Sequence, residues 1–300
     1  MKVSELAHLC NYEFVGQDLD VSSIKYADTA TNTSIAIIRN KEDIEKTKAN
    51  CILLPFSLVD TKKTIIYSCD PIEFAAVNLA KKMINTESYE RIQYQKKDDY
   101  FIGKNTNIGR GTIISPNVFI DNDVIIGKNC YIEPNVHIGN GTIIKDNVYI
   151  GSGSSIGSKS FYLYYEDGDL KEFIGTGVVV INSGVCIGNG VTIQRGTFSN
   201  TNIGENCKIG NLIEIGHDVY IGRNCKIVSQ TGIASNVKVG DYVQIYGQVG
   251  IANNISIGNN VTIHARAMVT KNICDNQSIS GVYARSHTEE MKNLAKIRKL

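Results

Sequence analysis

An aliphatic residue recurs every six positions between residues 102 and 269, and this spacing constrains the fold more than any other feature. Ile102 opens an unbroken register that runs to Ile156. The frame is lost over residues 160–177, resumes at Ile181, slips by four residues before Ile203, and then continues to Val269. Neither a helix of 3.6 residues per turn nor an alternating strand produces a strict period of six. A coil of short parallel strands does, and three hexads per triangular coil predict roughly eight coils.

Each hexad is expected to form one flat face, with its aliphatic residue pointing inward and Gly or Asn at the corners, where positive φ is tolerated. Strings such as IGRGTI, IGKNCY and IGENCK fit this description. The pattern resembles the hexapeptide-repeat proteins, whose parallel β-helix is left-handed. The resemblance supplies the handedness, an expected homotrimer, and acyl transfer from thioesters as the commonest activity. We therefore expect a mainly β fold, with a left-handed parallel β-helix over residues 99–280 and a loop insertion at 160–177.

The chain outside residues 99–280 lacks the period of six. Residues 1–98 predict a small α/β domain, for which the family resemblance implies nucleotide or substrate binding, and residues 94–101 read as a polar linker. Residues 281–300 are net basic and predict a short C-terminal helix, with Thr288 as its N-cap. In the first domain, the expected helices are Val3–Leu9, Lys41–Lys48 and Pro71–Met83, and the expected strands are Ser34–Ile38, Cys51–Leu54 and Thr64–Tyr67.

Charge and composition exclude some function classes. Lysine and arginine total 31 against 30 acidic residues, a net charge of +1, which argues against nucleic-acid binding through a broad basic face. The start, MKVSELAHLC, does not read as a signal peptide. The longest charge-free run, between Glu172 and Arg195, is too rich in Gly, Asn and Ser to span a membrane. The eight cysteines form no CxxC pair. We expect reduced thiols and a cytoplasmic protein.

His217 is the strongest candidate for a catalytic residue. A β-helix has no deep interior pocket, so its chemistry must use the outer faces, and His217 directly follows a corner glycine in NLIEIGHDVYIG (211–222). Amine acylation requires a proton acceptor that works at neutral pH, which an imidazole provides. A lone surface histidine is nevertheless more often incidental than catalytic.

Residues 215–222, Ile-Gly-His-Asp-Val-Tyr-Ile-Gly, resemble the catalytic coil of hexapeptide acyltransferases that act on nucleotide-linked sugars. The whole chain is similar to the UDP-3-O-acylglucosamine N-acyltransferases of lipid A synthesis. This resemblance covers the first domain, the interrupting loop and the basic tail. It implies that His217 is the general base, with Asp218 as the nearest candidate for orienting it.

One coil is 18 residues, so Ser235, Asn253 and Lys271 are expected to stack in turn above His217. In the family, the backbone N–H one coil above the histidine stabilises the thioester oxyanion, and the residue is typically Gly where this chain has Ser235. Asn253 and Lys271 would mark the path of the donor's pantetheine arm, and Asn254 stands where the family has a second histidine. Surface polar residues in a stack are an equally good interpretation of each.

The aromatic loop and the first domain supply the remaining candidates. Tyr162, Tyr164 and Tyr165 could contact a sugar nucleotide, or could simply pack a long loop. The family holds uracil with two aromatic residues that flank an asparagine, which aligns here as Asn40, but the aromatic positions are Ile37 and Asp43.

The differences from the family at Ile37, Asp43 and Asn254 favour acylation of another nucleotide-linked amino sugar for surface-glycan synthesis, with acyl-CoA as the donor. The alternative is the lipid A reaction, with a 3-hydroxyacyl carrier protein as the donor. We expect no prosthetic group and no metal. Two other classes of function are a zinc hydratase and a non-catalytic scaffold. The hydratase would need three converging histidines, and the spacing of the histidines here does not stack them on the coils.

Overall fold

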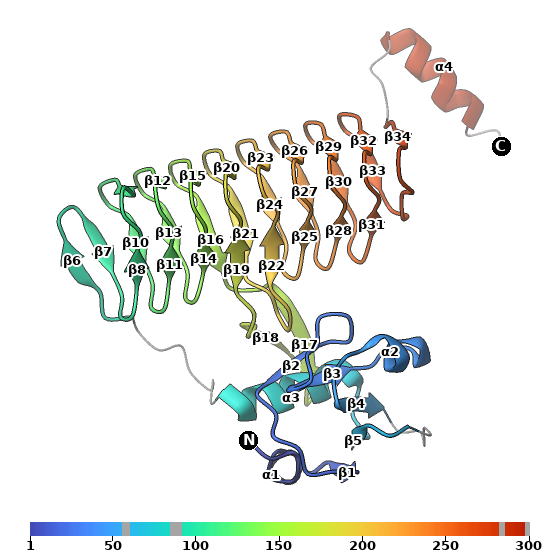
Figure 1. Ribbon diagram of the computed structural model, residues 1–300. Coiled ribbons are helices and arrows are strands. Elements are labelled where there is room, and N and C mark those ends of the chain that lie inside the picture. The colour runs from blue at the N-terminus through green and yellow to red at the C-terminus, as the bar shows by residue number, and fades with distance from the viewer. Residues whose placement is uncertain (56–60, 85–91, 282–285, 298–300) are drawn as a thin grey trace.

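The computed structural model describes residues 1–55, 61–84, 92–281 and 286–297. Most of the chain forms one long column of short parallel strands, and a small α/β domain packs beside its middle (Figure 1). None of the helices in these described ranges is both long and apolar enough to cross a membrane.

The column has three parallel faces, each a ladder of strands that pair with the coils below and above. The first face carries β7 (Tyr100–Ile102), β10 (Phe119–Ile120), β13 (His137–Ile138), β16 (Ser155–Ser158), β21 (Thr192–Gln194), β24 (Glu214–Ile215), β27 (Gly232–Ile233), β30 (Gly250–Ile251) and β33 (Met268–Val269). The second carries β8 (Asn107–Ile108), β11 (Ile125–Ile126), β14 (Ile143–Ile144), β19 (Val179–Ile181), β22 (Thr201–Ile203), β25 (Tyr220–Ile221), β28 (Lys238–Val239) and β31 (Ser256–Ile257). The third carries β9 (Ile113–Ile114), β12 (Tyr131–Ile132), β15 (Tyr149–Ile150), β20 (Cys186–Ile187), β23 (Lys208–Ile209), β26 (Lys226–Ile227), β29 (Gln244–Ile245), β32 (Thr262–Ile263) and β34 (Ser278–Ile279).

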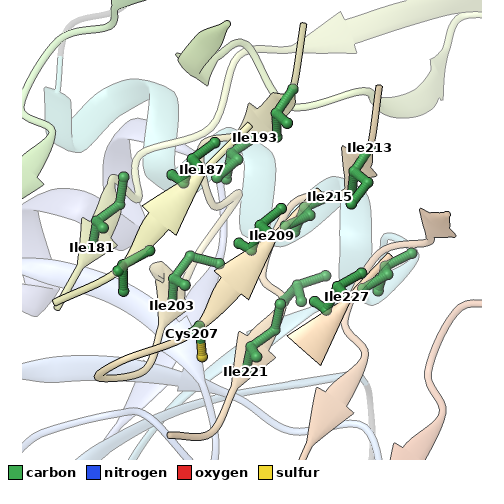
Figure 2. Packing of buried hydrophobic residues seen from close by; sticks show 14 of the residues in the cluster. Ile181, Ile187, Ile193, Ile203, Cys207, Ile209, Ile213, Ile215, Ile221 and Ile227 are labelled. Carbon is green, nitrogen blue, oxygen red and sulfur yellow. The ribbon is translucent and has the colours of Figure 1, made fainter. Parts of the chain in front are cut away.

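The interior of the column is filled by the aliphatic residues of the repeat, as the period of six predicts. Ile215 pairs with Ile233, which pairs with Ile251, so equivalent side chains lie 18 residues apart. Figure 2 shows such isoleucines in rows, with Cys207 among them. Full burial of each such side chain contributes about 1.5–3 kcal/mol relative to its exposure. The inward residues therefore hold the coils in register.

Two insertions break this register, and both lie near the candidate site. After β16 the chain leaves the column as an antiparallel hairpin, β17 (Tyr162–Glu166) with β18 (Asp169–Phe173), which projects toward the first domain (Figure 1). One coil later, Thr192 pairs with Glu214, an offset of 22 residues instead of 18. The four extra residues form a loop at 195–200.

The first domain is a five-stranded sheet of order β1-β5-β4-β3-β2, in which only β1 is antiparallel to its neighbour. All the helices and strands that the sequence predicts in this domain are confirmed, with ends that differ by at most two residues. The prediction misses the short strands β1 and β2. The elements are α1 (Val3–Leu9), β1 (Glu13–Val15), β2 (Ser23–Tyr26), β3 (Ser34–Ile37), α2 (Lys41–Lys46), β4 (Cys51–Pro55), β5 (Thr64–Ser68) and α3 (Ile72–Ile84).

Two sequence predictions are wrong in detail. The segment 94–101 is not a plain linker, because β6 (Gln95–Lys97) pairs antiparallel with β7 and adds an end strand to the column. The C-terminal helix α4 (His287–Ile297) begins before Thr288, which therefore lies inside it and is not its N-cap. Residues 298–300 of the predicted helix lie outside the described part of the chain.

Aromatic side chains from the column enter the core of the first domain. Phe198, from the inserted loop, is 1 % exposed and packs edge-on to Tyr26 at 5.6 Å between ring centroids. Tyr164 and Phe173 of the hairpin join the same buried cluster. An ion pair between Lys238 and Asp28 adds a polar contact at the edge. This packing fixes the first domain over the corner that carries His217.

Candidate active site

His217 and Asp218 occupy the corner after β24, one of the corners at which a residue adopts positive φ. Asp218 has φ +59°, a left-handed conformation that Asp and Asn tolerate better than most residues. This turn brings its carboxylate back to the preceding imidazole, so that Oδ2 lies 2.8 Å from His217 Nδ1. The His217 side chain is 8 % exposed and that of Asp218 only 1 %. The pair is therefore held almost out of water.

The buried Asp218 carboxylate is compensated by backbone N–H groups of the inserted loop. Oδ1 accepts from Ser199 N–H at 2.8 Å, and Oδ2 accepts from Thr197 N–H at 3.0 Å. The Phe198 N–H adds a longer contact of 3.3 Å to Oδ1. Several hydrogen-bond donors to one carboxylate offset the cost of burying it. The loop that causes the four-residue slip in the repeat therefore supplies these N–H donors.

The partners of Nδ1 determine which imidazole nitrogen can accept a proton. An ionised carboxylate only accepts hydrogen bonds, so Nδ1 carries the hydrogen and donates to Asp218. The Thr197 hydroxyl lies 3.0 Å from the same nitrogen and supports this orientation. Nε2 is left with the lone pair. The arrangement makes Nε2 of His217 suited to remove a proton from a bound group.

Ser235 lies one coil above His217, as the spacing of 18 predicts. Its backbone N–H donates to no acceptor within the described residues, whereas the N–H groups of Ala234 and Asn236 on either side are both paired. The Ser235 residue is half-buried, so this donor is partly shielded from water. A free backbone N–H at this position can stabilise an oxyanion.

A cavity of about 550 Å³ connects His217 to the first domain and to the hairpin. Its wall contains four of the other predicted residues, namely Tyr162, Ser235, Asn253 and Asn254. Sequence reasoning missed the rest, which are Tyr26, Arg39, Glu73, Phe161, Leu163 and Asn236.

Tyr162 packs directly against the histidine. Its ring meets the His217 ring edge-on at 5.8 Å between centroids, and it also contacts Phe198. Burial, with the Glu73 carboxylate nearby, raises the pKa of the Tyr162 hydroxyl, so it stays protonated. The hydroxyl oxygen is hidden from solvent and has no hydrogen-bond partner in the described structure. The ring thus supports the imidazole by packing.

Besides Asp218, which contacts His217 Nδ1, four predicted residues do not line this cavity. Asn40 begins α2, where its backbone N–H donates to Asp43, so the structure gives it a place in helix capping. Tyr164 is 6 % exposed and its hydroxyl accepts a hydrogen bond from Lys81, which places it in the first-domain core. Tyr165 is 71 % exposed. Lys271 is exposed farther up the column.

Among the residues that the structure describes, no three His, Cys, Asp or Glu side chains gather closely enough to hold a metal ion. His137 pairs with Asp121, and His264 stacks on Tyr246, at places apart from His217. Neither histidine converges on the cavity described above.

Comparison with known proteins agrees with this geometry. The bacterial transferase hexapeptide family (six repeats) matches residues 123–158 and 200–235. The UDP-3-O-acylglucosamine N-acyltransferase of Campylobacter jejuni is 40 % identical over 237 residues, which cover 74 % of this chain and 73 % of that protein. The corresponding protein of Campylobacter concisus is 41 % identical over 230 residues, 73 % of each chain.

Among solved structures, the UDP-N-acetylglucosamine acyltransferase of Francisella novicida superposes with a TM-score of 0.57 at 28 % identity. The match covers 66 % of this chain and 72 % of that one. The repeat, the histidine corner and the extent of these matches agree: this chain belongs to the UDP-3-O-acylglucosamine N-acyltransferase family of hexapeptide-repeat acyltransferases, with their left-handed β-helix.

Proposed function

We propose that this enzyme transfers a 3-hydroxyacyl group from an acyl carrier protein to the amine of UDP-3-O-acylglucosamine. The curated relatives at about 40 % identity carry the name of this activity. They support the lipid A alternative over our first preference, a surface-glycan enzyme that uses acyl-CoA. The observation that carries the proposal within the site is the buried hydrogen bond of 2.8 Å between His217 Nδ1 and Asp218.

His217 acts as the general base in this proposal. The sugar amine attacks the thioester carbonyl carbon, and His217 Nε2 accepts the proton that the nitrogen must lose. The imidazole becomes positively charged as this happens. Asp218 stabilises that charge through Nδ1–H, and its own charge is maintained by the N–H groups of residues 197–199.

The carbonyl oxygen becomes negative in the tetrahedral intermediate, and the unpaired Ser235 N–H is placed to donate to it. As the intermediate collapses, the carbon–sulfur bond breaks and an amide bond remains. The proton held by His217 then goes to the thiolate that leaves. Asn253 and Asn254, one coil above Ser235, would contact the donor arm, with Lys271 beyond them.

We also propose that the protein acts in the cytoplasm as a homotrimer without a prosthetic group. Asn236 and Asn254 of the cavity wall lie at corners of the column with positive φ, where a second subunit would close the site. Light scattering during size-exclusion chromatography tests the assembly, and a monomeric mass would contradict it.

A thiol-release assay tests the substrate assignment. The purified protein is incubated with either a 3-hydroxyacyl carrier protein or short acyl-CoAs, each crossed with UDP-3-O-acylglucosamine and with dTDP-linked amino sugars. Turnover with the carrier protein and UDP-3-O-acylglucosamine supports the proposal. Turnover only with acyl-CoA and a dTDP-linked sugar would replace it with the surface-glycan reaction.

A further inference from the structure

Arg39 supplies the cationic side chain in the wall of the cavity that holds His217, among the residues described as lining it. It lies between β3 and α2, just past the carboxyl end of β3. Its guanidinium carbon sits 4.8 Å from the centre of the Tyr26 ring, and its Nε lies 3.5 Å from Glu73 Oε1. Two neighbours therefore hold the guanidinium in place on the cavity wall.

These contacts leave most of the guanidinium donors available. Arg carries five N–H donors in a planar fork, and the recorded Glu73 contact involves only Nε, at 3.5 Å. The Tyr26 hydroxyl is near enough for one further weak contact. Both members of the Arg39–Glu73 pair are more than a third exposed, and such pairs contribute little to stability. Glu73 lines the same cavity, so an anion bound by Arg39 takes the place of this weakly held carboxylate, which must turn away.

The positions where the resemblance would place aromatic rings around a uracil base cannot stack on one in this structure. Ile37 is 3 % exposed within β3, and the Asp43 carboxylate accepts the Asn40 N–H at the start of α2. A base therefore cannot stack at these positions. Arg39, next to Asn40, instead presents a guanidinium that its neighbours already hold in place. This combination points to a nucleotide that is held by its phosphates.

We propose that Arg39 binds the diphosphate of the nucleotide-linked sugar and is the main source of nucleotide affinity, with little discrimination between bases. This inference rests on the proposed function for the identity of the substrate. A guanidinium fork matches phosphate oxygens in pairs, and charge-assisted bonds of this kind are about twice as strong as neutral ones. From Arg39, the sugar end of the substrate extends along the same cavity to His217.

The first test measures binding to the full-length protein by calorimetry, with UDP, dTDP and uridine as the probes. The unmodified protein is expected to bind UDP and dTDP within about threefold of each other, and uridine at least tenfold more weakly. Arg39→Met is expected to weaken UDP binding by about 10–100-fold and leave uridine binding unchanged. Arg39→Lys keeps the charge without the planar fork, so its UDP affinity should fall between those of the unmodified protein and Arg39→Met. Arg110→Met, at an exposed corner of the column, is the matched control and should bind UDP normally.

Unchanged UDP binding in Arg39→Met, a preference of more than tenfold for UDP over dTDP, or no UDP binding at all would each overturn the inference. A melting temperature for every variant separates a local effect from unfolding. The kinetic counterpart is a raised KM for the nucleotide sugar in Arg39→Met, with kcat and the donor KM unchanged. Because UDP binding needs no acyl donor, UDP binding that depends on Arg39 without transfer to UDP-3-O-acylglucosamine would reject the proposed reaction and keep the diphosphate site.

Discussion

Replacement of Asp218 by asparagine tests the hydrogen-bond network around the base with a change of one atom. The backbone N–H groups of residues 197–199 would hold the amide oxygen at the Oδ1 position, because they can only donate. The amide NH₂ would then face His217 Nδ1, which must become the acceptor. The hydrogen moves to Nε2, and the base loses the lone pair that it needs. Loss of a positioned general base costs about 10²–10⁴-fold in rate.

The same substitution should also destabilise the protein. In the native structure the Thr197 N–H lies 3.0 Å from Oδ2 and 3.1 Å from Oδ1. An NH₂ group in place of Oδ2 leaves this N–H only Oδ1 as an acceptor, and the neutral amide also weakens the other N–H contacts. Hydrogen bonds to a charged group contribute about 1.5–3 kcal/mol each, so we expect a loss of this order. Thiol release measures kcat, and urea denaturation measures the free energy of unfolding.

Asp123→Asn is the matched control for this experiment. Asp123 occupies an equivalent corner with φ +58° and accepts a hydrogen bond from Asn105, away from the site. This variant should retain its kcat and its stability. If Asp218→Asn keeps its kcat within about twofold of the unmodified enzyme, Asp218 does not set the protonation of His217, and our account of the base is refuted.

Three further changes separate packing from chemistry. Tyr162→Phe removes a buried hydroxyl that has no partner in the described structure, so the melting temperature should hold or rise and kcat should stay within about threefold. A tenfold loss of kcat would show that the hydroxyl binds substrate. Phe198→Ala should lower the free energy of unfolding by about 3–5 kcal/mol in urea denaturation, because the ring is fully buried between the domains; a loss under 1 kcal/mol would contradict that packing. Ser235→Gly keeps the backbone N–H and should retain kcat within about threefold in the thiol-release assay, whereas a large loss would assign the role to the side chain instead.

The period of six predicts the column and much of the site because it is a geometric rule that repeats. The stacking of Ser235 and Asn253 above His217 follows from arithmetic alone, and the strand register agrees with it. The slip of four residues before Ile203 was also visible in the sequence. The place where the inserted loop packs could not be predicted, because such a loop can leave a corner in several directions. Only the structure shows that it places the Thr197 N–H on the Asp218 carboxylate.

The first domain has no such rule, and the predictions there are weaker for that reason. Its helices and strands follow from local patterns, but the way it docks on the column depends on Phe198 and the hairpin. Tyr26, Arg39 and Glu73 reach the cavity only through that docking. The three tyrosines of the loop illustrate the same limit. Tyr164 is buried and Tyr165 is exposed, and only Tyr162 reaches the cavity, because the docking of the hairpin on the first domain decides which of them meets the site.

The most direct test of the account is the rate of acyl transfer to UDP-3-O-acylglucosamine by the unmodified protein and by His217→Ala, with a 3-hydroxyacyl carrier protein as the donor. We predict turnover by the unmodified enzyme and a fall of at least about 10²-fold in the variant, with its fold intact by circular dichroism. Equal turnover by the two proteins would show that His217 is not the base, and would contradict the central claim.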